Sequence, residues 1–110
     1  MFPVWEQYLI QLGYLHIFMK LVGKHLLDGF KKKHHDVCSQ IDSWFIEAAV
    51  ANWQSPRDIK QRYVSASILP DNHVIFNLKG NKYRLKVQIN YKNQLILIKN
   101  IGKHDEYMRW

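Results

Sequence analysis

The C-terminal end of the sequence brings together titratable groups of different kinds. A histidine, a glutamate and a tyrosine occur at His104, Glu106 and Tyr107. Histidine carries protons near neutral pH, and tyrosine can donate a proton or stack on a base. Such groups suit metal-free RNA cleavage, in which a base takes the proton of the ribose 2′-hydroxyl and an acid protonates the leaving 5′-oxygen. That chemistry also needs cations to stabilise the charge that the phosphate gains.

The stretch 72–101 supplies those cations on an alternating pattern. Within 82–90, apolar side chains at odd positions alternate with polar ones at even positions, which is typical of a strand with one buried side. Glycine and asparagine tolerate positive φ, so a two-residue loop at 80–81 is expected to place Asn77 opposite Arg84.

A second turn at Lys92-Asn93 extends the same pattern into a third antiparallel strand. The expected pairs are Val87 with Ile98, Ile89 with Ile96, Lys86 with Lys99, and Arg84 with Ile101. The tail around His104 should then emerge beside Lys82 and Arg84. The polar face is expected to gather Lys79, Lys82, Arg84, Lys86 and Lys99.

Such a cluster of cations on one sheet face favours an anionic partner, because like charges on neighbouring strands repel. Any one of these lysines, taken alone, is more simply a solvated surface residue. The clustering of five is what favours a binding surface.

Length and composition indicate one basic globular domain. The chain has 110 residues, of which 47% are hydrophobic, enough for one core. Sixteen lysines and arginines oppose nine acidic residues, for a net charge of +7 that favours nucleic acid or another polyanion. Cys38 is the only cysteine, so no internal disulfide can form and we expect a reducing, cytoplasmic location.

The middle of the chain is expected to support the sheet with helices. Ser39 with Asp42 is typical of a capped helix start, and Ser55-Pro56 is typical of another. An aromatic stripe that includes Trp44 should pack under the sheet. The expected elements are a strand within 15–22, helices over 24–36, 39–52 and 56–63, and a connection over 64–72.

The first helix carries a basic flank over 31–35, which we expect to be exposed. Its neighbouring His34 and His35 point about 100° apart on a helix, and no Cys or His cluster accompanies them, so no metal site is expected.

The organised part of the sequence is expected to begin at Met19. Residues 1–18 are apolar, but their uncharged run is shorter than the 20 or so residues of a membrane helix, so no membrane contact is expected. We interpret 1–18 as an extension and 19–110 as a single domain. The alternative is that Leu15 and Ile17 prolong a first strand.

Three motifs together identify a family resemblance. They are Asp58-Ile59-Lys60, the Phe-Asn-x-x-Gly-Asn-x-x-Arg pattern over 76–84, and Gly102-x-His104-x-Glu106-Tyr107. They resemble motifs of the HigB toxins of bacterial type II toxin–antitoxin systems, within the RelE-like group of messenger-RNA endonucleases. The resemblance spans about residues 19–110. The family usually has threonine and aspartate where this chain has Lys103 and Met108.

The resemblance implies an α+β fold, with N-terminal helices packed on one face of a small antiparallel sheet. It implies a toxin that cleaves messenger RNA on the translating ribosome without a metal or other cofactor, and that a helix-turn-helix antitoxin of the HigA type holds inactive. The expected catalytic residues are His104, Tyr107, Arg84 and Glu106. The expected RNA contacts are Asn77, Lys79, Asn81, Lys82, Lys86, Lys99 and Lys103.

Two other functions remain open on the sequence. One is a non-catalytic module that binds RNA or the ribosome through the same basic face. The other is a degenerate toxin whose basic face only docks an acidic segment of an antitoxin. New 5′ ends in a messenger, or growth inhibition relieved by a neighbouring reading frame, would distinguish an active toxin from both.

Overall fold

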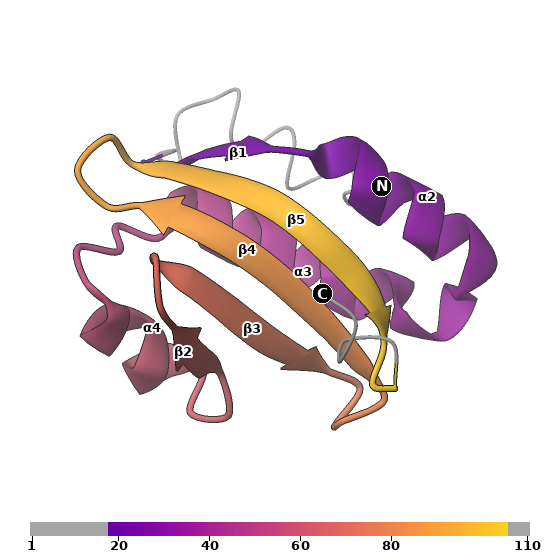
Figure 1. Cartoon of the computed structure of the whole chain (residues 1–110). Coiled ribbons are helices and arrows are strands. Elements are labelled where there is room, and N and C mark those ends of the chain that lie inside the picture. The colour runs from indigo at the N-terminus through magenta and orange to yellow at the C-terminus, as the bar shows by residue number, and fades with distance from the viewer. Residues whose placement is uncertain (1–17, 106–110) are drawn as a thin grey trace.

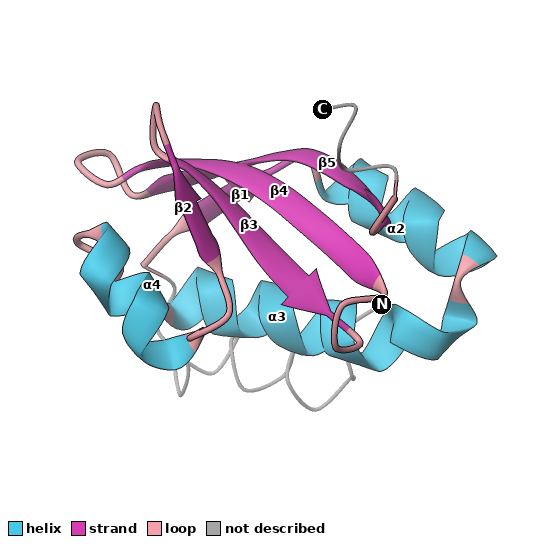
Figure 2. Cartoon of the chain, turned by 60° about the horizontal axis from the view of Figure 1, so that its bottom comes forward, coloured by secondary structure: helices cyan, strands magenta, loops and turns pink. Residues whose placement is uncertain are grey.

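The computed structural model describes residues 18–105, which form a five-stranded sheet with helices packed on one of its faces (Figures 1 and 2). The expected α+β class is confirmed. The sheet order is β1-β5-β4-β3-β2. The elements are β1 (Lys20–Val22), α2 (Lys24–Lys33), the 3-10 helix η1 (His35–Val37), α3 (Cys38–Val50), α4 (Pro56–Arg62), β2 (Ser67–Leu69), β3 (His73–Leu78), β4 (Tyr83–Asn90) and β5 (Leu95–Lys103).

The first hairpin has the predicted register. Asn77 lies opposite Arg84, and the Lys82 N–H donates to the Lys79 carbonyl oxygen at 3.2 Å across the turn. Positive φ values were expected at Gly80 and Asn81. They fall instead on Lys79 and Gly80, at 52° and 65°. The turn therefore places a lysine in the left-handed region that glycine and asparagine occupy more easily.

The second hairpin follows the predicted register only as far as a β-bulge. Near its turn, Val87 faces Ile98 as predicted. The ladder then shifts between Lys86 and Val87, so that Lys86 faces Asn100 and Lys99 is the extra residue. The predicted pairing of Lys86 with Lys99 is wrong, because a bulge sets two residues against one.

Because of the same shift, the residues at the start of β4 face β5 residues one position later than predicted. Arg84 faces Gly102, and the predicted pairing with Ile101 is wrong. Gly102 is buried and adds no side chain opposite Arg84.

Two short strands at the edges complete the sheet. β1 pairs in parallel with β5, which confirms a strand at the end of the 15–22 stretch and makes the sheet mixed. β2 pairs antiparallel with β3, although 64–72 was expected to be only a connection. Its three residues are too few to show an alternating pattern, and Ile68 is exposed.

The core lies between the apolar face of β3–β5 and the helix α3, which runs beneath the sheet in Figure 2. Phe76 on β3 is its aromatic centre. The Trp44 ring meets it edge-on at 5.3 Å, the Tyr63 ring edge-on at 5.1 Å, and the Trp53 ring stacks at 6.0 Å. The predicted packing of the aromatic stripe under the sheet is confirmed.

The start of α3 differs from the prediction. Val37 is its N-cap, no side chain caps it, and Ser39 lies inside the helix. The Asp42 carboxylate instead accepts a hydrogen bond from the Lys31 ammonium at 2.6 Å. Burial disfavours the charged ammonium, but the hydrogen bond with Asp42 helps to outweigh it, and the pKa of Lys31 is raised. Lys31 is only 8% exposed and is not part of an exposed flank.

Gly23, which precedes α2, is expected to resist substitution. Its φ is 102°, and a Cβ there would lie 2.8 Å from the Ile98 carbonyl oxygen on β5. We expect Gly23→Ala to destabilise the fold by about 2 kcal/mol, measured by urea unfolding. Gly29→Ala is the matched control, since nothing lies within 4 Å and the residue is helical; it should stabilise by about 0.5–1 kcal/mol. Equal stability of the two variants would contradict this.

Candidate nucleic-acid interface

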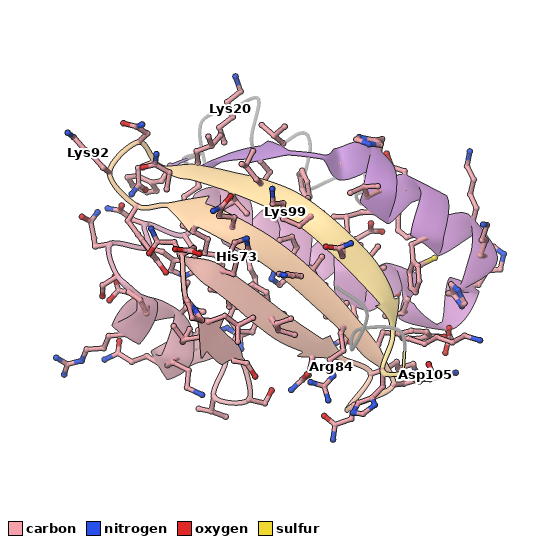
Figure 3. The ribbon with its side chains drawn as sticks, viewed as in Figure 1. Lys20, His73, Arg84, Lys92, Lys99 and Asp105 are labelled. Atoms are coloured by element: carbon pink, nitrogen blue, oxygen red, sulfur yellow. The ribbon has the colours of Figure 1, made fainter. Side chains whose placement is uncertain are left out.

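The sheet face opposite α3, here called the open face, carries part of the predicted cation cluster. Arg84 and Lys86 alternate on β4, and Lys99 lies on the same face in Figure 3. Lys79 and Lys82 are exposed in the β3–β4 turn at one end of the sheet. The predicted five-cation face is therefore divided into three cations on strands and two in the turn.

Lys82 is held by an acid from the helix layer. Its ammonium lies 2.7 Å from the carboxylate of Asp36 in η1, with side-chain exposures of 59% and 38%. The hydrogen bond from Lys82, followed by that from Tyr83, lowers the pKa of Asp36, and the same Asp36 contact raises the pKa of Lys82. Exposed ion pairs contribute little in water, so an RNA phosphate can compete for this lysine.

The predicted catalytic tail leaves the sheet beside this turn. The His104 N–H donates to the Lys82 carbonyl oxygen at 3.0 Å, and Gly102 pairs with Arg84. The expectation that the tail emerges next to Lys82 and Arg84 is confirmed. Figure 3 shows the neighbouring Asp105 and Arg84 toward the same end of the molecule. Glu106 and Tyr107, both predicted catalytic residues, lie outside residues 18–105.

The other three residues predicted to contact RNA lie in three different places. The Asn77 amide donates to the Ser65 carbonyl oxygen at 2.9 Å, so it anchors the segment before β2. Lys103 faces Tyr83, whose side chain points into the core, so Lys103 leaves β5 on the helix side of the sheet. Asn81 lies exposed in the β3–β4 turn.

Sequence reasoning missed the polar cluster around Tyr83. The Tyr83 hydroxyl donates to the Asp36 carboxylate at 2.9 Å and lies 3.5 Å from His34 Nδ1. The His34 ring stacks on Phe30 at 4.2 Å. Asp36 and Tyr83 are 47 positions apart, and no sequence pattern links them. With its lowered pKa, the Asp36 carboxylate stays charged at neutral pH and ties the turn to η1.

The Asp36 contacts predict a stability that depends on pH. A carboxyl whose folded pKa lies below its ordinary value of 3.8 stabilises the fold above about pH 4, and that stability is lost as the pH falls through the folded pKa. We expect Asp36→Asn to lower the thermal midpoint at pH 6 and to narrow its gap to wild type near pH 3. Lys82→Met removes the ion pair but keeps the contact of Tyr83 with Asp36. It should therefore lower the thermal midpoint at pH 6 by part of the amount expected for Asp36→Asn. A gap that stays constant between pH 6 and pH 3 would contradict the assignment.

A separate groove of about 470 Å³ lies between α3, the end of α4 and β3. Trp44 and Phe76 line it, and its charges are already paired. Glu47 forms an ion pair with Arg62 and accepts a hydrogen bond from the Tyr63 hydroxyl at 2.7 Å. Burial, followed by this hydrogen bond, raises the pKa of Tyr63. With its cation neutralised, this groove suits an anionic ligand less well than the open face does.

Residues 18–105 contain neither a cluster of metal-binding side chains nor a membrane-spanning helix. Within residues 18–105, no three His, Cys, Asp or Glu side chains are grouped so that they could hold a metal ion. The helices of that part of the chain are too short or too polar to cross a membrane.

Comparison with known proteins assigns the family. No curated protein matches the chain. The family model of HigB_toxin, described as the RelE-like toxic component of a toxin-antitoxin system, matches residues 38–110, about two thirds of the chain. The match covers the β3–β4 hairpin and the terminal motif, and it begins at α3, later than the expected residue 19. The chain therefore belongs to the HigB toxin family and is a RelE-like toxin of a toxin–antitoxin system.

Proposed function

We propose that this toxin is a metal-independent endoribonuclease that cleaves messenger RNA on the translating ribosome in the cytoplasm, and that a helix-turn-helix antitoxin of the HigA type restrains it. The observation that carries the proposal is the position of His104. Its backbone N–H is bonded to the Lys82 carbonyl oxygen in the turn, two residue pairs beyond the pair of Arg84 and Gly102. A proton carrier and two cations thus meet at one end of the open face.

The chemistry assigns a distinct task to each group. His104 transfers a proton, as the base for the ribose 2′-hydroxyl or the acid for the leaving 5′-oxygen. Arg84, with Lys86 and Lys99, holds the RNA backbone and stabilises the charge that the phosphate gains. Tyr107 stacks on a base or transfers the second proton, and Glu106 is a further proposed catalytic residue.

The test is to add the purified toxin to ribosomes translating a defined messenger and to map new 5′ ends. We expect new ends in the presence of ribosomes, and their loss when the antitoxin is added in equimolar amount. Growth inhibition on expression should follow the same pattern. A messenger that stays intact while the toxin is bound to ribosomes would contradict cleavage.

A non-catalytic function is the alternative that specific residues favour. Lys103 and Met108 stand where the family usually has threonine and aspartate in the terminal motif. In that case the open face would bind RNA or the ribosome, or would only dock an acidic segment of the antitoxin. Ribosome binding without new 5′ ends identifies the first, and antitoxin binding without ribosome binding identifies the second.

We further propose that residues 19–110 form the functional domain and that residues 1–18 are an extension. Met19 supports this boundary because it is 1% exposed in the core and directly precedes β1. A chain that begins at Met19 should fold and inhibit growth as the full chain does.

A further inference from the structure

The open face of β4 changes in chemistry along its length. Arg84, Lys86, Gln88 and Asn90 occupy alternate positions of the strand and therefore share that face. The first two are cations and the last two are amides. At about 3.3 Å per residue, Gln88 lies roughly 13 Å along the strand from Arg84. The amides therefore lie beyond the cations, away from the His104 end.

The neighbouring strand β5 changes in step with β4. Arg84 faces Gly102 and Lys86 faces Asn100, whereas Gln88 faces Leu97. Asn90 in turn faces Leu95. The bulge at Lys99 separates these two halves of the face. Figure 3 shows Lys99 and His73, the β3 residue opposite Gln88, on this same side of the sheet.

At the amide end, the face is hollowed. A depression of about 320 Å³ is lined by Asn72, Gln88, Ile89, Asn90, Leu95 and Leu97. None of these side chains is charged. The hollow therefore offers amide groups above an apolar floor, and it differs in kind from the cationic half of the face.

In each of the two amides on β4, one atom forms a hydrogen bond within the protein and the other atom is left to bind a ligand. Gln88 Nε2 donates to the Asp71 carbonyl oxygen at 3.1 Å, which leaves Oε1 as an acceptor. Asn90 Oδ1 accepts the Asn93 N–H at 2.9 Å, which leaves Nδ2 as a donor. Within residues 18–105, neither of these remaining groups has a partner. An acceptor and a donor are thus fixed in place at the same hollow.

We propose that this hollow binds a nucleobase of the messenger and contributes to the choice of cleavage site. The inference rests on the proposed function, since the cations of the same face would hold the phosphates of that strand. Asparagine and glutamine amides recognise the donor and acceptor groups on base edges. An apolar surface accommodates the faces of an unstacked base. A neutral hollow does not favour a phosphate, so a base is the part of the RNA that it fits.

The test compares cleavage sites of the wild type and of Asn90→Asp on the same translated messengers. Aspartate keeps the acceptor for the Asn93 N–H but replaces the Nδ2 donor. Asn93→Asp is the matched control, because it adds the same charge in the adjoining exposed turn, outside the lining of the hollow. We expect Asn90→Asp to change the ratio of cleavage between preferred and other sites by roughly tenfold. The control should keep the wild-type pattern.

A second variant addresses the apolar floor. Leu97→Ala is expected to reduce the ratio of cleavage between preferred and other sites. Thermal unfolding and antitoxin binding of this variant check that the protein is folded. Wild-type cleavage with an unchanged pattern in both Asn90→Asp and Leu97→Ala would overturn the base site and leave the endonuclease assignment standing. Absence of cleavage by the wild type would overturn the proposed function itself.

Discussion

His104→Ala is expected to lower messenger cleavage on translating ribosomes by about 10²- to 10⁴-fold, the range that proton transfer by a side chain contributes. Growth inhibition should disappear with it. The fold should be retained, because the bond from residue 104 to the Lys82 carbonyl uses the backbone N–H, which alanine keeps. The measurement is the amount of new 5′ ends per unit time, with antitoxin binding recorded for the same protein.

The matched control for this variant is His25→Ala, which removes an exposed histidine from α2. It should cleave and inhibit growth as the wild type does. Full toxicity of a stably expressed His104→Ala protein would remove His104 from the mechanism. Loss of antitoxin binding in that variant would show instead that the substitution had altered the structure.

The β3–β4 hairpin was predictable because two independent signals agreed. The alternation of apolar and polar residues set which side of each strand is buried, and the Gly-Asn pair located the turn. A shift of one residue would have exposed the apolar set, which includes Phe76 and Leu85, both buried. The observed register of Asn77 opposite Arg84 follows from those constraints.

The register beyond the bulge could not be obtained from the same pattern. The residues from Ile98 to Ile101 read as a continuous strand in the sequence, and a bulge needs no particular residue at Lys99. The partners of Asp36 were also hidden, because Lys82 is 46 positions away and only the packing of η1 against the turn brings them together. Local patterns thus located β3, β4 and β5 but not β2, whereas contacts between distant segments decided that Lys82 is paired with Asp36.

In the proposed mechanism, Arg84 is the cation expected to matter most for cleavage. Arg84 lies between the turn and Lys86, opposite the side-chain-free Gly102, and is half-buried. A guanidinium presents a planar fork of donors that fits two phosphate oxygens at once, which a lysine ammonium cannot do. In the proposed mechanism, the Arg84 guanidinium is therefore better suited than a lysine to meet the charge that develops on the phosphate.

Arg84→Ala is expected to reduce cleavage by about 10²- to 10³-fold, as does loss of one donor to a developing oxyanion. Arg84→Lys should recover only part of that loss. With His104→Ala as background, binding to RNA on the ribosome should also become less dependent on salt, with the slope of log affinity against log salt falling by about 0.7 for one lost phosphate contact. Arg57→Ala on α4 removes an exposed arginine and serves as the control. Unchanged cleavage and an unchanged slope in Arg84→Ala would move the phosphate contact to Lys86 or Lys99, because these are the other cations on the open face.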